Sequence, residues 1–311
     1  MREHRPARIL ISLTTIPPRM GSAVHSALDA AVSSGHDVIL SVPRSYRKWG
    51  AYDIPASLAA REDIILHRPD EDFGAATKLM GALDWLDAPG DYTHILTFDD
   101  DCWYPEPVLP ISVLLTAGRA QKQPTVVTFG GIRLDHPPFR RGDGLTYDNV
   151  GHVDVVAGFR GVLYPLEAIW PARAEFFELR HRLPPGIFND DDAYFGMVLA
   201  SRRIPIWAVP TVIPEIGLSK KSMATAPEGD DSGVASGAAI PRQENEAQLF
   251  RHAVAHGILP NPFVPRPSPF GRVLRSEPIR PTVRRLRSAR AVSTRFVSRI
   301  RHGIRRRISG A

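Results

Sequence analysis

The chain has 311 residues, of which 43% are hydrophobic and 23% charged, the composition of an ordinary globular protein of one large or two small domains. It contains no run near the roughly 18 apolar residues of a membrane span, and its N-terminus, MREHRPARIL, lacks the apolar core of a signal peptide. A single cysteine, Cys102, excludes an intrachain disulfide and a cysteine-rich metal site, so we expect a cytoplasmic protein.

The net charge of +6 is unevenly distributed. Thirteen arginines and one acid, Glu277, give the last 40 residues a charge of +12, which leaves −6 for the first 271. The sequence therefore combines a mildly acidic body with a strongly basic tail, and the two parts need separate interpretations.

In the first 130 residues, short apolar stretches alternate with helical patterns, which predicts βαβ units and a largely parallel sheet. The predicted helices are 21–35, which Gly35 would end, and 75–86. The predicted strands are 7–15, 37–42, 63–68, 93–98 and 125–131.

The second half is less regular. A long polar connection (131–149) leads to two short strands around a glycine bend (153–165), a helix introduced by Asp residues (187–203) and a strand (204–210). Residues 219–241 are rich in Gly, Ser and Ala and predict a flexible loop before a closing helix at 242–257. The predicted units are a catalytic domain (1–258), a Pro-rich linker (259–280) and a basic tail (281–311).

Three consecutive carboxylates, Asp99, Asp100 and Asp101, follow the apolar stretch 93–98. A solvated turn, or the cap of a helix opened by Pro105, would explain them as structure alone. A divalent cation is the functional alternative, because hard cations take carboxylate oxygen ligands. In an extended backbone Asp99 and Asp101 would share a face and Asp100 would point away. The pattern predicts an Asp-x-Asp cation site at the carboxyl end of a strand, where open α/β sheets bind ligands.

Five segments stand in one order along residues 7 to 215: ISLTTIPPR, FGAATKL, FDDD, AGFRGVLYP and FNDDDAYFG. Together they resemble the nucleotide-sugar glycosyltransferases of the GT-A fold, in particular a family-2-like bacterial group. The resemblance implies an α/β fold with a Rossmann-like, mixed and mostly parallel sheet flanked by helices.

The resemblance also implies a donor site for a nucleotide diphosphate-sugar of the UDP or GDP type. Such enzymes hold the donor through a Mn²⁺ or Mg²⁺ ion carried by the Asp-x-Asp motif, which offsets the charge of the leaving diphosphate. By this resemblance Asp101 is a metal ligand, Asp99 contacts the ribose or the water shell of the metal, and Asp100 supports them. The residues that would border the nucleotide are Thr14, Thr15, Arg19 and Lys78. For Lys78, a solvated position on a helix is the alternative.

A second acidic cluster, Asp190, Asp191 and Asp192, stands at the start of the helix predicted in 187–203. These residues can simply cap the helix and complement its dipole. In inverting members of the family, an acidic residue at this place removes the proton of the acceptor hydroxyl, which it can do only within hydrogen-bond reach. Asp191 and Asp192 both remain candidates for this base. The expected acceptor is a glycan or a lipid-linked molecule.

The basic tail has apolar residues at every third or fourth position from Val283 to Ile308, with most arginines on the other side. This pattern predicts a basic amphipathic helix, which is typical of an interfacial anchor on anionic membranes. We expect it to hold the protein at the inner face of the cell membrane. A disordered or oligomer-packing tail is the alternative, and nucleic acid is disfavoured because the body is acidic and the tail has few aromatic residues.

Two other functions fit parts of the sequence. A phosphohydrolase of the haloacid dehalogenase type also places Asp-x-Asp after an apolar strand, with the first Asp as nucleophile. Its motif usually lies near the N-terminus, with a lysine shortly before the second acidic cluster, whereas here 98 residues precede Asp99 and residues 146–190 hold no lysine. A protein that kept a GT-A-like fold without catalysis would bind a nucleotide or a membrane but turn nothing over.

Overall fold

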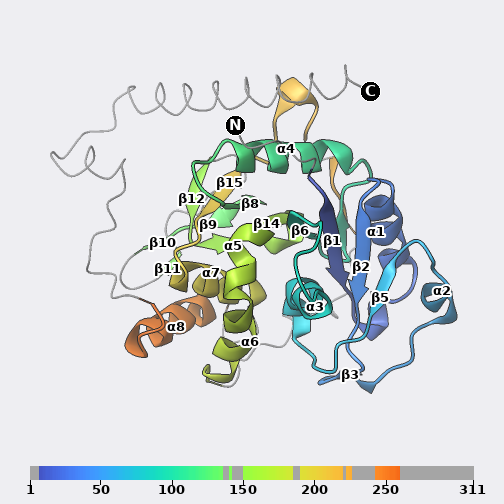
Figure 1. The fold of residues 1–311 in the computed structure, drawn as a ribbon, viewed down its shortest axis with the longest axis horizontal. Helices are drawn as coiled ribbons and strands as arrows, with labels where there is room; N and C mark the ends of the chain where they lie inside the picture. The colour runs from blue at the N-terminus through green and yellow to red at the C-terminus, as the bar shows by residue number, and fades with distance from the viewer. Residues whose placement is uncertain are drawn as a thin grey trace.

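The computed structural model describes residues 7–135, 140–141, 150–184, 190–219, 222–225 and 242–259. A central sheet is formed by eight strands: β1 (Ile9–Thr14), β2 (Asp37–Ser41), β5 (Ile65–His67), β6 (His94–Thr97), β8 (Val126–Phe129), β12 (Gly151–Val153), β14 (Val162–Pro165) and β15 (Ile206–Val209). Their spatial order is β12-β15-β8-β14-β6-β1-β2-β5 (Figure 1).

The sheet is mixed and mostly parallel, which confirms the predicted fold class. Strands β5, β2, β1 and β6 are parallel neighbours, and β15 is parallel to β8. Strand β14 runs antiparallel between β6 and β8, and β12 runs antiparallel to β15 at one edge. The carboxyl ends of β1, β2, β5 and β6 therefore lie along one edge of the sheet, where β14 begins.

Helices cover both faces of the sheet. They are α1 (Ser22–Val32), α2 (Ala56–Ala59), α3 (Thr77–Trp85), α4 (Val108–Arg119), α5 (Leu166–Ile169), α6 (Arg173–His181), α7 (Asp191–Ser201) and α8 (Arg242–Ala255). Figure 1 shows α4 on one side of the sheet and α6 and α8 on the other.

Strand β1 shows how the core is divided. Leu10 packs in a cluster with residues of α3 and α5 to α8, whereas Ile9 and Ile11 pack in a second cluster with residues of α1, α2 and α4. A strand that is buried on both faces needs apolar side chains at nearly every position, which explains the continuous apolar run in β1.

Several predicted elements are confirmed. Helix α1 ends at Val32, and Gly35 follows with a φ of +74°, the left-handed conformation that glycine adopts at a helix stop. The two strands predicted in 153–165 are β13 (Val155–Val156) and β14, and the glycine bend between them contains the 3₁₀ helix η3 (Gly158–Arg160). The linker from residue 260 onward, the basic tail, and parts of the connections at 136–149 and 220–241 lie outside the described residues.

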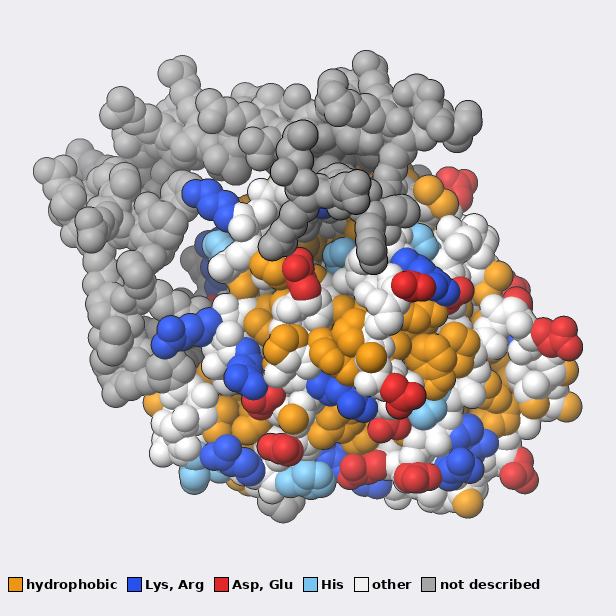
Figure 2. Space-filling model, viewed as in Figure 1, with side chains coloured by type: hydrophobic (Ala, Val, Ile, Leu, Met, Phe, Trp, Pro, Cys, Tyr) orange, Lys and Arg blue, Asp and Glu red, His pale blue; other side chains and the backbone are white. Residues whose placement is uncertain are grey.

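The described surface carries charges of both signs. On the face in Figure 2, Lys and Arg side chains are interspersed with Asp and Glu, and apolar patches lie between them. Within the ranges given above, no helix is long and apolar enough to cross a membrane.

Candidate functional site

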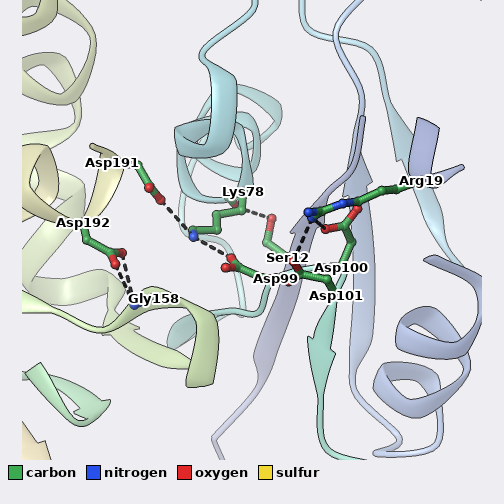
Figure 3. A network of polar contacts seen from close by, with 9 residues as sticks. All are labelled: Ser12, Arg19, Lys78, Asp99, Asp100, Asp101, Gly158, Asp191 and Asp192. Carbon is green, nitrogen blue, oxygen red and sulfur yellow. Dashed lines mark hydrogen bonds and ion pairs between the residues drawn. The ribbon is translucent and has the colours of Figure 1, made fainter. Parts of the chain in front are cut away.

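Five carboxylates and two cations gather at the edge of the sheet where β1 and β6 end and β14 begins (Figure 3). They form two groups, which we call the Arg19 cluster and the Lys78 cluster. The Arg19 cluster contains Arg19, Thr15, Asp100 and Asp101. The Lys78 cluster contains Lys78, Asp99, Asp191, Asp192 and the backbone of Gly158.

The Asp run forms a turn and does not continue the strand. Strand β6 ends at Thr97, and Asp99 forms an isolated bridge with Cys102, whose N–H donates to the Asp99 carbonyl at 3.4 Å. Asp100 and Asp101 occupy the middle of this turn. The expectation that Asp99 and Asp101 share a face is therefore wrong, because side chains alternate only where the backbone is extended. Asp100 and Asp101 share one cation, and Asp99 faces another.

In the Arg19 cluster, the Arg19 guanidinium lies 3.0 Å from Asp100 Oδ1 and 2.9 Å from Asp101 Oδ2. The Thr15 hydroxyl donates to Asp100 Oδ2 at 2.6 Å. Burial raises the pKa of Asp100 to about 6, although the Thr15 hydrogen bond and the Arg19 charge oppose the shift. The cluster thus holds the turn against the end of β1.

Thr14 and Tyr46 tie this region to the neighbouring loops. The Thr14 hydroxyl donates to the Ser41 carbonyl of β2 at 2.8 Å, and the Tyr46 phenol donates to the Thr15 carbonyl at 2.9 Å. Thr15, Arg19 and Asp100 are brought together as the sequence suggested, while Thr14 points its hydroxyl at β2. Nucleotide contact by these residues stays a prediction.

Lys78 is the centre of the second cluster. Its ammonium lies 2.6 Å from Asp99 Oδ1 and 2.8 Å from Asp191 Oδ2, and only 3% of the residue is exposed. The alternative of a solvated lysine is therefore excluded. Burial alone would lower the pKa of Lys78, but the attraction of Asp191 and Asp99 outweighs it and holds the pKa well above its usual value.

The three residues of the second Asp run have three different surroundings. The Asp190 carboxylate accepts the Ala193 N–H at 3.1 Å and caps α7, which confirms the capping interpretation for this residue. Asp191 faces Lys78. Both carboxylate oxygens of Asp192 accept the N–H of Gly158 at 3.1 Å. Asp191 and Asp192 thus both lie near Lys78, but only Asp191 forms an ion pair with the ammonium that also contacts Asp99.

The donor chemistry of the edge suits a hard divalent cation. The two clusters together carry a charge of −3, because five carboxylates are offset by two cations, Lys78 and Arg19. No three acidic, His or Cys side chains of the described ranges converge as a complete metal site. Mg²⁺ bound with a nucleotide needs only one or two carboxylates, because substrate phosphates supply further ligands. Asp101, with 33% of its side chain exposed, is open to such an ion.

Two features were missed by reasoning from the sequence. The first is the closeness of Gly158 to the Lys78 cluster: a Cβ there would lie 2.3 Å from Asp192 Oδ1 and 2.9 Å from Lys78 Nζ. In the sequence, the glycines of GFRG (158–161) indicate a close approach of the backbone to the donor, and an ordinary glycine bend explains them equally well. The second is a pocket of ≈ 250 Å³, one of whose lining residues, Tyr46, donates its hydroxyl to the Thr15 carbonyl. Its lining residues are Ser45, Tyr46, Arg47, Asp70, Glu71, Asp72 and Arg180.

Comparison with known proteins gives similarities to solved structures only. No protein family and no curated protein matches the chain. Among solved structures, it is similar to 4-diphosphocytidyl-2C-methyl-D-erythritol synthase from Anaerococcus prevotii, with 14% identity and a TM-score of 0.41 over 80% of this chain and 99% of that one. It is also similar to residues 1–349 of TarS from S. aureus, with 10% identity and a TM-score of 0.40 over 67% and 61% of the two chains.

HddC from Yersinia pseudotuberculosis matches at 12% identity and a TM-score of 0.32, over 52% of this chain and 78% of that one. This chain spans about three fifths of the TarS fragment. Likenesses at these scores carry no argument about function.

Proposed function

We propose that this chain is a transferase that moves a sugar from a nucleotide diphosphate-sugar to a hydroxyl acceptor. The observation that carries the proposal is the Lys78 bridge, which places Asp191 beside the acidic turn at the carboxyl edge of a mostly parallel sheet. Open α/β sheets bind ligands at this edge. A donor bound at the turn and an acceptor beside Asp191 would therefore meet.

The roles of the side chains follow from their surroundings. Thr15 and Arg19 fix the turn, so that Asp101 keeps a partly exposed carboxylate toward the donor. Asp101 would hold a Mn²⁺ or Mg²⁺ ion, joined by Asp99 where its pairing with Lys78 is released, and the bound ion would supply positive charge against the leaving diphosphate. Asp191 accepts the proton of the acceptor hydroxyl, and the transfer inverts the sugar carbon. We prefer Asp191 to Asp192 as the base because both oxygens of Asp192 already accept the Gly158 N–H.

Thermal unfolding with UDP, GDP, CDP and dTDP, each with and without Mn²⁺, tests the proposal. A ligand at about 100 times its dissociation constant stabilises the folded state by about 2.7 kcal/mol. We expect a Mn²⁺-dependent rise in Tm with one nucleotide, and we expect Asp101→Asn to abolish it. Asp91→Asn is the matched control, because Asp91 is 78% exposed and pairs only with the exposed Arg8 among the ion pairs described.

The outcome separates the competing functions. Absence of any shift with all four nucleotides would remove the donor site and with it the glycosyltransferase proposal. Hydrolysis of p-nitrophenyl phosphate that depends on Asp99 would instead favour a phosphohydrolase with Asp99 as nucleophile. Nucleotide binding with no turnover of any nucleotide-sugar would favour a binding protein.

We further propose that the basic tail (281–311) attaches the protein to anionic membranes. Its thirty-one residues contain no acidic residue and follow the amphipathic pattern described above. The full chain should sediment with vesicles of phosphatidylglycerol and not with vesicles of phosphatidylcholine, and salt should release it because the attraction is electrostatic. Equal binding to both lipids would contradict an electrostatic anchor.

A further inference from the structure

Lys78 is a buried lysine whose charged ammonium is stabilised by carboxylates and not by water. It lies on the first turn of α3, it is 3% exposed, and its ammonium contacts one carboxylate from each of two distant segments. One carboxylate is enough to offset the desolvation cost of a buried lysine ammonium. A second partner means that the lysine also joins two elements.

The two elements joined are the turn after β6 and the start of α7. Asp99 contributes from the turn, and Asp191 contributes from the first residue of the helix. Figure 3 shows the ammonium of Lys78 between the two carboxylates, with Asp192 and Gly158 on the side of Asp191. The Ser12 hydroxyl, which donates to the Lys78 carbonyl at 2.5 Å, fixes the backbone of the lysine to β1.

The space around the ammonium is closed on the third side by Gly158. A Cβ at this position would meet both Asp192 Oδ1 and Lys78 Nζ. The absence of a side chain therefore lets the loop before β14 approach the cluster and bond Asp192 through its N–H. The Lys78 ammonium is thus confined, so a change in its ion pair with Asp99 also changes its ion pair with Asp191.

We propose that Lys78 is a positioning residue, a counter-cation shared by Asp99 and Asp191 for which a divalent cation at Asp99 competes. This inference rests on the function proposed above. While the donor site is empty, Lys78 divides its attraction between the two carboxylates. With Asp99 held by a cation, Lys78 would pair with Asp191 alone and would fix the carboxylate that accepts the acceptor proton. Donor binding and placement of the base are coupled in this way through one ammonium.

The test is titration of the full-length protein with Mn²⁺ alone, with the free ion followed by electron paramagnetic resonance. In Asp191→Asn, Lys78 pairs fully with Asp99, so we expect Mn²⁺ affinity to fall several-fold. In the double variant Lys78→Met/Asp191→Asn the competing cation is gone, so affinity should rise several-fold above that of Asp191→Asn. Asp190→Asn is the charge control: it removes the same charge from the neighbouring residue, keeps a capping side chain, and should change affinity less than twofold.

Lys78→Met alone leaves two half-buried carboxylates without their cation, and it is expected to lower Tm or prevent folding. The double variant removes one charge of each sign and should unfold at a higher temperature than Lys78→Met, so the comparison does not depend on the single variant. Equal Mn²⁺ affinity in Asp191→Asn and the double variant overturns the proposal, and so does absence of Mn²⁺ binding in every protein. Stabilisation by a nucleotide diphosphate without metal would leave the proposed function standing in either case.

Discussion

Replacing Gly158 by alanine tests the packing of the Lys78 cluster with a single methyl group. The added Cβ would lie 2.3 Å from Asp192 Oδ1 and 2.9 Å from Lys78 Nζ, closer than real Cβ contacts. The backbone of Gly158 does not have a positive φ, so alanine meets no conformational penalty there. Any loss of stability therefore reports the contact and not the backbone.

We expect Gly158→Ala to lower the free energy of unfolding by about 2–3 kcal/mol. Overpacking of a filled core costs about 1–3 kcal/mol. The value should lie in the upper part of this range, because Asp192 can retreat only by lengthening its two hydrogen bonds to the Gly158 N–H, and hydrogen bonds to charged groups are worth about 1.5–3 kcal/mol. For a domain of this size, 1 kcal/mol corresponds to about 2–4 °C in Tm.

Urea unfolding followed by circular dichroism measures the loss directly. Gly118→Ala is the matched control: Gly118 lies inside α4, and its Cβ would make an ordinary 3.5 Å contact with Val127. Alanine is favoured over glycine inside a helix by about 0.5–1 kcal/mol, so the control should be neutral or stabilising. If both variants unfold at the wild-type urea concentration, the cluster is not packed as described and Gly158 does not confine Lys78.

Three further predictions concern stability. Burial lowers the pKa of His94 to about 4, so as pH falls the unfolded chain binds a proton at this histidine before the folded chain does. The free energy of unfolding should therefore decrease between about pH 6.5 and 4, by at most about 3 kcal/mol. In His94→Gln, the urea midpoint should change less over this pH range. Asp190→Ala should cost about 1 kcal/mol in urea unfolding through loss of the α7 cap, while Asp190→Asn should cost little; equal losses would contradict the capping role. Tyr46→Phe should cost about 1 kcal/mol, measured in the same way, because the Thr15 carbonyl loses a buried donor; an unchanged midpoint would show that water replaces the phenol.

The predictable parts of the fold are those that depend on local pattern. Apolar runs and their stop signals located β1, α1 and α7, because burial on both faces and a glycine or Asp at the boundary leave direct traces in the sequence. The position of β14 left no such trace. An antiparallel strand between two parallel neighbours has the same apolar composition as they have, so only long-range pairing distinguishes it.

The site was predictable as a set of residue types and not as a geometry. The two Asp runs were found because three adjacent carboxylates repel one another, which indicates a cation or another partner that stabilises them. Their pairing was not found: a lysine on a helix reads as solvated until the fold places it between Asp99 and Asp191. A turn at Asp100 and Asp101 was among the alternatives, but its pairing with Arg19 was not found, because Arg19 is distant in the chain.

The order of the two clusters along the chain has a consequence for biosynthesis. Strands β1, β2, β5 and β6 are complete at Thr97, while α7 begins at Asp191; at about 5–20 residues per second, the ribosome takes about 5–20 seconds to cover the interval. Arg19 and Lys78 are already synthesised when the Asp run emerges, and both precede Asp191 and Asp192. The four carboxylates that pair with Arg19 or Lys78 therefore leave the ribosome after their cation, and the nascent sheet does not have to bury them unpaired.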